Sequence, residues 1–549
     1  MADPLPSAGI GALVALVAVI VVSVWLGTVA QRSLQQGSFL KGYFLGNRGL
    51  GAWALALTAT VQSGGTFMGY PSLIYTHGWI VALWIGSYMV VPITGFAVLG
   101  KRFAQLSRRT GAITVPDLLR YRFGSPAVGL IASLFIIAFM SAMMVAQFKA
   151  GAIIMKISWP GTGALALAED VEGGIDRAYY IGLAVFSITV VSYTLIGGFL
   201  ASVWTDLFQS ILMIIGVVLL FLLVVPLAPG AAMQDATWKA VENTGPNFAF
   251  GPGYSPDGRE FLPIGLAFSF FVVWVFGGVG SPAGMVRVMA CRDTPTVRRS
   301  LVLLSFYNLM IYLPLMVICV HARAIMPNLA SSDEVIPRLA LWSTQDIPGG
   351  SFVGGLILAA PFGAVMATVS TYLVVIASGL VKDVYLRFVR PHATQSEIRR
   401  ITYLVMISFG MLAVVANIRP VAYLQAIVVF SSSSTAATLL VPALMAAFWR
   451  RATAPGAIAA MLTGSTTCLT LYATGWIMAF RGIDQLIGQK TDFRPYFLWG
   501  LEPIVWGLLA SLVAGVGVSL LTRPPQADLL SWLFDADAKP PADIPQQLN

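Results

Sequence analysis

The stretch YTLIGGFLASVWTD at 193–206 is the part of the sequence that bears most directly on the fold. It places the carboxylate of Asp206 at the start of a long apolar segment, directly after the pair Gly197-Gly198. A charged side chain at the mouth of a membrane span is costly to bury, so such a residue is usually functional.

The composition places this stretch in a membrane protein. Hydrophobic residues make up 57% of the 549 residues and charged residues 10%, and the mean hydropathy is +0.80. Long apolar runs recur from residue 8 to residue 521, which predicts an all-α polytopic membrane protein. The formal net charge of +9 fits an excess of Lys and Arg on cytoplasmic loops and requires no nucleic acid. The three Cys and three His show no zinc-binding spacing, so no cofactor is expected.

Thirteen spans are expected. They cover 8–30, 51–75, 78–99, 126–153, 178–197, 203–228, 262–283, 301–322, 350–378, 401–418, 422–447, 455–480 and 500–521. Most of the 33 Lys and Arg fall on one side of this arrangement. The bias predicts an N-terminus outside and a C-terminus in the cytoplasm, in a plasma membrane such as the bacterial inner membrane. The first apolar run lacks a basic flank and is expected to be a span, not a cleaved signal.

Two of these spans contain glycine-rich interruptions. Residues 57–71 read LTATVQSGGTFMGYP, and residues 276–282 read FGGVGSP. Unwinding at such sites frees amides and carbonyls for ions and polar solutes. Interrupted spans at matching positions of two halves indicate an inverted-repeat transporter. The alternative is close packing of glycine where helices cross.

A third segment carries hydroxyl groups. Residues 360–372 read APFGAVMATVSTY, in which positions 364, 368 and 371 share one helical face. Sodium, a hard cation, is suited by several oxygen ligands, which hydroxyls and freed carbonyls can supply. These hydroxyls can instead bond to their own backbone.

Together these segments resemble the sodium:solute symporter family over residues 8 to about 521, and 197–206 resembles its most distinctive stretch. Within the family the likeness is greatest to sodium/pantothenate symporters. The supporting residues are YFLGNR at 43–48, LTAT at 57–60, VIP at 335–337, LAAP at 358–361 and KDVYL at 382–386.

The resemblance implies a leucine-transporter-like inverted-repeat fold with about 13 transmembrane helices. Its parts would be an N-terminal extra helix and cytoplasmic loop (1–50), a first five-helix repeat (51–228), an external loop (229–261), a second five-helix repeat (262–447), peripheral helices (448–521) and a cytoplasmic tail (522–549).

The family's sodium site carries over to backbone carbonyls of Ala59, Gln62 and Ala364 and to hydroxyls at positions 367 and 368. This chain has Thr368 but Ala367, so one usual ligand is missing. A second sodium site or a gate would use Asp206, Ser370 and Thr371. The alternative for Asp206 is a helix N-cap.

The expected solute site lies between the two interruptions, where a half-helix N-terminus suits a carboxylate. Its candidates are Ser63, Gly64, Gly65, Thr66, Gln147, Phe276, Gly277 and Gly278. Lys149 is a further candidate and could instead extend outward to the membrane surface. The serines at 431–434 are expected mainly to aid close packing.

The resemblance implies a symporter that imports a small organic carboxylate, such as pantothenate or another monocarboxylate, with sodium by alternating access. Its partners would be the solute, Na⁺ and the lipid bilayer, with no obligate protein partner. Two alternatives remain open: a proton-coupled symporter with Asp206 as the carrier, and a membrane sensor built on a transporter-like domain. An enzyme is disfavoured because the spans show no paired carboxylates, His cluster or placed nucleophile.

Overall fold

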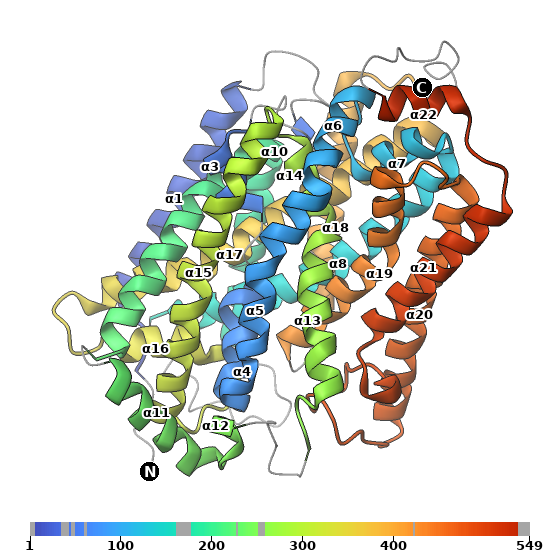
Figure 1. Ribbon diagram of the computed structural model, residues 1–549. Helices are drawn as coiled ribbons and strands as arrows, with labels where there is room; N and C mark the ends of the chain where they lie inside the picture. Colours follow the sequence, from blue (N-terminus) through green and yellow to red (C-terminus); the bar gives the residue numbers. More distant parts are fainter. Residues whose placement is uncertain are drawn as a thin grey trace.

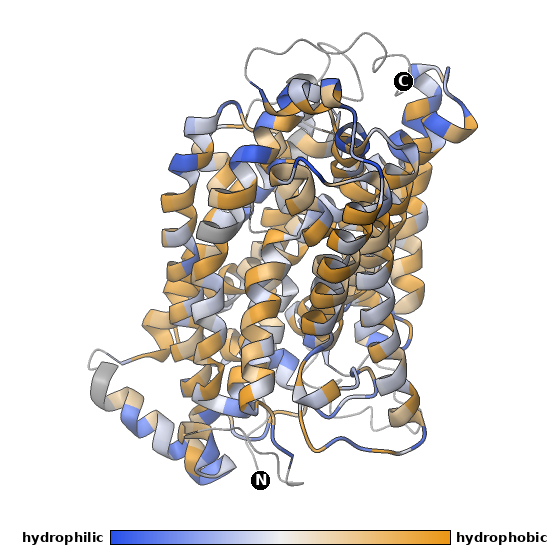
Figure 2. Cartoon of the chain, turned by 45° about the vertical axis from the view of Figure 1, so that its right-hand side comes forward, coloured by the Kyte–Doolittle hydropathy of each residue, from blue (hydrophilic) through white to orange (hydrophobic). Residues whose placement is uncertain are grey.

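The chain folds into a bundle of long helices, shown in a computed structural model that describes residues 6–33, 43–44, 50–59, 63–160, 177–226, 229–250, 259–420 and 423–535 (Figure 1). Hydrophobic residues dominate the middle of the bundle, and hydrophilic residues gather at its two ends (Figure 2). Spanning helices show this distribution because lipid offers their backbones no hydrogen bonds. Among the described residues the only β-pairing consists of two isolated bridges. The predicted all-α polytopic architecture is confirmed.

The helices of the described ranges follow one another closely along the chain. They are α1 (Ile10–Ser33), α3 (Ala52–Ala59), η2 (Gly65–Gly69), α4 (Tyr70–His77), η3 (Gly78–Val81), α5 (Ala82–Val91), η4 (Pro92–Gly100), α6 (Lys101–Thr110), α7 (Val115–Phe123), α8 (Pro126–Ser158), α10 (Arg177–Val224), α11 (Pro229–Thr244), α12 (Asn247–Phe250), α13 (Ile264–Val279), α14 (Pro282–Met289), α15 (Thr294–Ile325), η5 (Ser332–Glu334), α16 (Val335–Trp342), α17 (Gly350–Ser378), η6 (Gly379–Val389), α18 (Gln395–Ala416), α19 (Leu424–Phe448), α20 (Ala454–Phe480), η7 (Leu498–Gly500), α21 (Pro503–Leu521) and α22 (Ala527–Phe534).

Twelve segments of the described chain are long and apolar enough to cross a membrane. The difference from the expected thirteen lies at 51–75 and 78–99. There α3 is too short to span alone, and one apolar segment, Gly65–Val91, runs across the expected boundary between the two spans. Gly78 marks that boundary with a φ of +72°, which ends α4.

The centre of the bundle is α17, in which every residue from Ile357 to Ser378 is buried. It packs against α1, α8 and α10. The contact with α1 is close because a Cβ atom on Gly355 would lie 2.5 Å from the Cα of Ala12. The helix expected to be an N-terminal addition therefore packs directly on the core.

Of the two expected helix interruptions, the second is present and the first is described only in part. At the first, residues 60–62 lie outside the described ranges, α3 ends at Ala59, and the next helical segment begins at Gly64 after the non-helical Ser63. The second separates α13 from α14 at Gly280 and Ser281, and Pro282 opens the new helix. Proline suits that position because its missing N–H would have no partner in the first helical turn.

The glycine pair before Asp206 breaks α10 between the expected spans 178–197 and 203–228. Gly198 has φ 56° and ψ −147°, and a Cβ atom there would lie 2.6 Å from the ring of Tyr43. Only glycine meets both conditions without strain. The break divides α10 into the spans Arg177–Ile196 and Ser202–Val224.

One end of the bundle carries α6, α7 and α22, and the other carries α11 and α12 (Figure 1). We call the first the basic end. Here the guanidinium groups of Arg102, Arg122 and Arg450 surround the ring of Phe534 on α22, each within 5.2 Å of its centroid. Burial lowers the pKa of Arg122, which lies outside the spans, to about 10.

Candidate functional site

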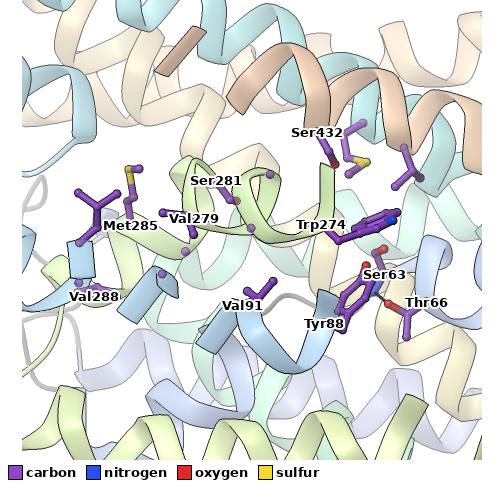
Figure 3. Close-up of a pocket in the computed structure, with 18 of the residues that line it drawn as sticks. Ser63, Thr66, Tyr88, Val91, Trp274, Val279, Ser281, Met285, Val288 and Ser432 are labelled. Atoms are coloured by element: carbon purple, nitrogen blue, oxygen red, sulfur yellow. Dashed lines mark hydrogen bonds between the residues drawn. The ribbon is translucent and has the colours of Figure 1, made fainter. Parts of the chain in front are cut away.

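A cavity of about 130 Å³ lies between the two helix interruptions. Ser63 and Thr66 line it from the first interruption, and Gly277, Gly278 and Ser281 line it from the second. Figure 3 shows Ser63, Thr66, Tyr88 and Trp274 grouped at one end of the cavity, and Met285 and Val288 at the other. The sequence thus brings together polar groups from segments about 210 residues apart, as an inverted-repeat arrangement requires.

Large rings close the cavity on the side away from the basic end. The ring centroids of Trp84 and Trp274 are 4.8 Å apart, and those of Tyr88 and Tyr312 are 4.2 Å apart. Tyr70 joins them with its centroid 5.4 Å from that of Tyr312. We call these five residues the aromatic end. Such tilted and offset ring contacts pack densely and leave little space between them.

Glycines line part of the opposite side of the cavity, beside the larger side chains of Leu99, Phe103 and Met285. Gly95 and Gly100 of η4 and Gly284 of α14 contribute no side chains there, and Val288 lies opposite Gly100. We call this part the glycine-lined end. Because η4 runs directly into α6, the cavity extends toward the basic end.

Hydrogen bonds stabilise the chain at the first interruption, from Ser63 to Thr66. Gln147 of α8 accepts the N–H of Gly64 through Oε1 at 2.7 Å. The hydroxyl oxygen of Ser63 accepts the N–H of Gly65 at 3.1 Å, and Thr66 Oγ1 lies 3.0 Å from the hydroxyl of Tyr312. Gln147 therefore positions the interruption and is not among the cavity-lining residues, whereas Ser63 and Thr66 are.

At the second interruption, only two of the three residues predicted for the solute site line the cavity. Gly277 and Gly278 line the cavity, and a Cβ atom on Gly278 would lie 2.7 Å from Val91 Cγ1. Phe276 is 38% exposed and is not among the lining residues.

The residues predicted for the sodium site are only partly described. Ala364 and Thr368 are fully buried in α17, and Thr368 donates its hydroxyl hydrogen to the carbonyl of Ala364 at 2.9 Å. Ala59 ends α3, and Gln62 lies outside the described residues.

The three residues predicted for a second site meet in the structure. Thr371 Oγ1 lies 3.4 Å from Asp206 Oδ2. Ser202 Oγ joins the group 3.3 Å from the same carboxylate oxygen and 3.0 Å from Ser370 Oγ. Asp206 follows the break at Gly198 by about two helical turns, so it lies inside a helix and does not cap one.

Arg287 is the site residue that the sequence analysis missed. Its Nη2 atom forms an ion pair with Asp206 Oδ2 and donates to Thr371 Oγ1. The side chain is only 1% exposed. The expected seventh span covers 262–283 and leaves Arg287 in the loop that follows it. The structure extends the helical segment to Met289. Pro282, as a helix-starting residue, is the signal that could have revealed this.

A second buried ion pair involves Lys149, which does not extend outward. Its Nζ lies 2.7 Å from Asp333 Oδ2, and the two side chains are 7% and 2% exposed. The same oxygen accepts the N–H of Leu424 at 3.3 Å. The pair thereby joins α8, η5 and the start of α19.

The serine run at 431–434 makes hydrogen bonds within the bundle. Ser431 donates to the carbonyl of Phe139 at 2.7 Å, and Ser433 donates to Glu502 Oε1 at 2.9 Å. Ser431 and Ser433 therefore connect α19 to neighbouring elements, in keeping with a packing role, whereas Ser432 lines the cavity (Figure 3).

Comparisons with known proteins agree with this arrangement. Residues 43–464 match the sodium:solute symporter family. The chain is 32% identical to the sodium/pantothenate symporter of Escherichia coli K12 over 525 residues, covering 94% of this chain and 98% of that relative. The corresponding protein of Haemophilus influenzae Rd is 30% identical, covering 80% and 86% of the two chains.

The fold is shared with a solved structure as well. A substrate-bound, outward-open Na⁺-coupled sialic acid symporter superposes with a TM-score of 0.68 at 19% identity, covering 94% of this chain and 99% of that chain. This likeness supports the inverted-repeat fold. The family match covers most of the chain, and the two pantothenate symporters align with nearly their whole lengths. The chain belongs to the sodium:solute symporter family.

Proposed function

We propose that this sodium-coupled symporter imports a small organic carboxylate, most like pantothenate or another monocarboxylate. The observation that carries the proposal is the 32% identity to a sodium/pantothenate symporter along 98% of that relative. The cavity is compatible with such a solute, because it combines hydroxyl groups at an interrupted helix with apolar and aromatic walls.

In this proposal the solute binds between the interruptions. Ser63, Thr66, Gly277 and Gly278 contact it, while Gly64, Gly65 and Gln147 keep the first interruption in shape. Phe276 has no direct role. The backbone amides at the interrupted helices favour the solute's carboxylate.

Sodium would bind beside the solute, through the carbonyls of Ala59, Gln62 and Ala364 and the hydroxyl of Thr368. The burial of Ala364 and Thr368 supports this placement, because a desolvated set of neutral oxygens can replace the water around a cation without a buried negative charge. Ala367 leaves this site one hydroxyl short of the family pattern.

The basic end would face the cytoplasm, following the excess of Lys and Arg on that side. The structure would then represent a state in which rings block the outer path and the cavity extends inward. Alternating access exchanges this state with one in which the aromatic end separates and the glycine-lined end closes. A tenfold sodium gradient contributes ~1.4 kcal/mol to uptake.

Uptake by purified protein in liposomes tests the proposal. We expect an inward sodium gradient to drive labelled pantothenate accumulation, and replacement of sodium by potassium to abolish it. An inward proton gradient without sodium should give none. A panel of monocarboxylates and proline sets the specificity. Sodium-driven uptake of the zwitterion proline, without uptake of any anionic monocarboxylate, would overturn the solute class, and proton-driven uptake would establish the alternative coupling ion.

Variants of α17 test the sodium site in the same assay. Thr368→Ala should raise the sodium concentration for half-maximal uptake severalfold, and Thr368→Ser, which keeps the hydroxyl, should stay near wild type. Ala367→Ser should preserve or lower that concentration, because it adds the missing oxygen. An unchanged sodium dependence of a well-expressed Thr368→Ala protein would remove this residue from the site.

A further inference from the structure

We infer that Arg287 is the resident cation of the second site, so that the chain carries one sodium ion for each solute. The site consists of Asp206, Ser370 and Thr371 together with Ser202. This inference rests on the proposed function, since it counts the sodium ions that such a symporter binds.

The first support is geometric. A sodium ion at this site would need Asp206 and Thr371 as ligands, and the guanidinium of Arg287 contacts both through one nitrogen. Ser202 and Ser370 are hydrogen-bonded to each other within the same cluster. Two of the oxygens that a second ion would use, Asp206 Oδ2 and Thr371 Oγ1, are therefore already bound to a tethered positive charge, which would repel a second cation beside it.

The second support is the incomplete hydrogen bonding of the pair. Within the described residues, Asp206 Oδ1 and the Nε and Nη1 atoms of Arg287 have no hydrogen-bond partner. A buried ion pair is favourable only when its remaining donors and acceptors are satisfied. Protein groups alone therefore leave this buried pair incompletely satisfied, and its guanidinium is not explained as a source of stability.

The third support is the position of Arg287 in the cavity wall. It lies on α14 between Met285 and Val288, which both line the cavity. Its side chain points to α10 and α17, where Asp206 and Thr371 lie. The tethered cation thus joins the wall of the solute path to the two core helices. A free sodium ion could not make this connection.

The consequence for transport is electrical. One sodium ion entering with one monoanion moves no net charge, so the membrane potential would not drive uptake. Removing the guanidinium while keeping Asp206 should open the site to a second ion and make uptake move one positive charge per solute.

Counting bound ²²Na⁺ on purified protein tests the inference without any solute. We expect one sodium per wild-type molecule at saturation and two per Arg287→Ala molecule. Arg292→Ala, which removes an exposed cation five residues away, is the matched control and should bind one. Two ions on the wild type, or one ion on a folded Arg287→Ala protein, would overturn the inference.

A double variant covers the case in which Arg287→Ala fails to fold. Asp206→Asn with Arg287→Gln removes both charges and leaves no uncompensated carboxylate. We expect it to bind one sodium, as the wild type does. A loss of one ion relative to the wild type would show that Asp206 binds sodium despite Arg287, and would overturn the inference.

Charge measurements in liposomes give the second readout. With pantothenate as the solute, the wild type should move no net charge, and Arg287→Ala should move one charge per solute. If pantothenate is not transported, the proposed solute fails while the sodium count still decides the inference.

Discussion

The aromatic end and the glycine-lined end of the cavity differ in their residues: five packed rings form the first, and glycines beside larger apolar side chains form the second. At the aromatic end, rings fill the path with centroids of neighbouring rings 4.2 to 6.2 Å apart. At the glycine-lined end, a Cβ atom on Gly95 would be 3.6 Å from its nearest neighbour and one on Gly100 would be 3.4 Å from its own, so both positions have room for an added methyl group. On the proposed solute path, the barrier formed by the rings is therefore thicker than the barrier at the glycine-lined end.

On the proposed solute path, this difference shows how one scaffold can block the path at the aromatic end while leaving space at the glycine-lined end. The rings of the aromatic end pack densely against one another, so we expect them to separate together when the path opens. Glycines supply space without requiring any motion of side chains. The Lys149–Asp333 pair adds to the asymmetry, since it fastens η5 to α8 and α19.

The largest expected effect comes from breaking that ion pair. Lys149→Met should lower the free energy of unfolding by ~3–5 kcal/mol, because it leaves the carboxylate of Asp333 buried without its ammonium partner. Thermal unfolding in detergent measures the loss. Lys149→Met combined with Asp333→Asn should recover most of it. A single variant as stable as the wild type would mean that the pair does not fasten this region.

The next effect comes from filling the glycine-lined end. Gly95→Leu should reduce the initial rate of uptake at least tenfold, because the new side chain occupies the path, while sodium binding stays unchanged. Gly95→Ala is the matched control and should remain near wild type, since its Cβ meets Val279 at an ordinary 3.6 Å. Normal uptake by Gly95→Leu would show that the solute does not pass here.

A smaller effect is expected where Gln147 supports the first interruption. Gln147→Met keeps the length of the side chain but removes the acceptor for the Gly64 N–H. The lost hydrogen bond is worth ~0.5–1.5 kcal/mol, so the solute dissociation constant should rise roughly 2- to 12-fold. Equilibrium binding measures it. An unaltered constant would show that the interruption keeps its shape without α8.

The smallest effect is expected at the basic end, beyond the glycines. Phe534→Ala removes the ring between Arg102, Arg122 and Arg450, and cation–π contacts at such sites contribute ~0.5–1 kcal/mol each at most. We expect a drop of a few degrees in the unfolding temperature and normal uptake. Phe534→Tyr keeps the ring and should match the wild type. A large loss of uptake would extend the transport machinery to α22.

The sequence predicts best what local chemistry decides. The spans follow from hydropathy because a bilayer requires long apolar helices, and the breaks at 198 and 280–281 follow from glycine and proline. Ser370 and Thr371 could be placed near Asp206 from the family resemblance. Arg287 could not, because its partner lies 81 residues away and a cation at the end of a span resembles a loop cation. The Lys149–Asp333 contact, 184 residues apart, was hidden for the same reason.

The close contact between α1 and α17 means that α1 is synthesised long before the helix it packs against. The N–H of Ala12 donates to Ser351 Oγ, a residue 339 positions later in the chain. At ~5–20 residues per second, α1 waits roughly 17–68 s in the bilayer before this partner is made. During that interval its Gly- and Ala-containing face meets lipid or an insertion factor. By contrast, α20 and α21 are neighbours in sequence and can pair almost as soon as they emerge.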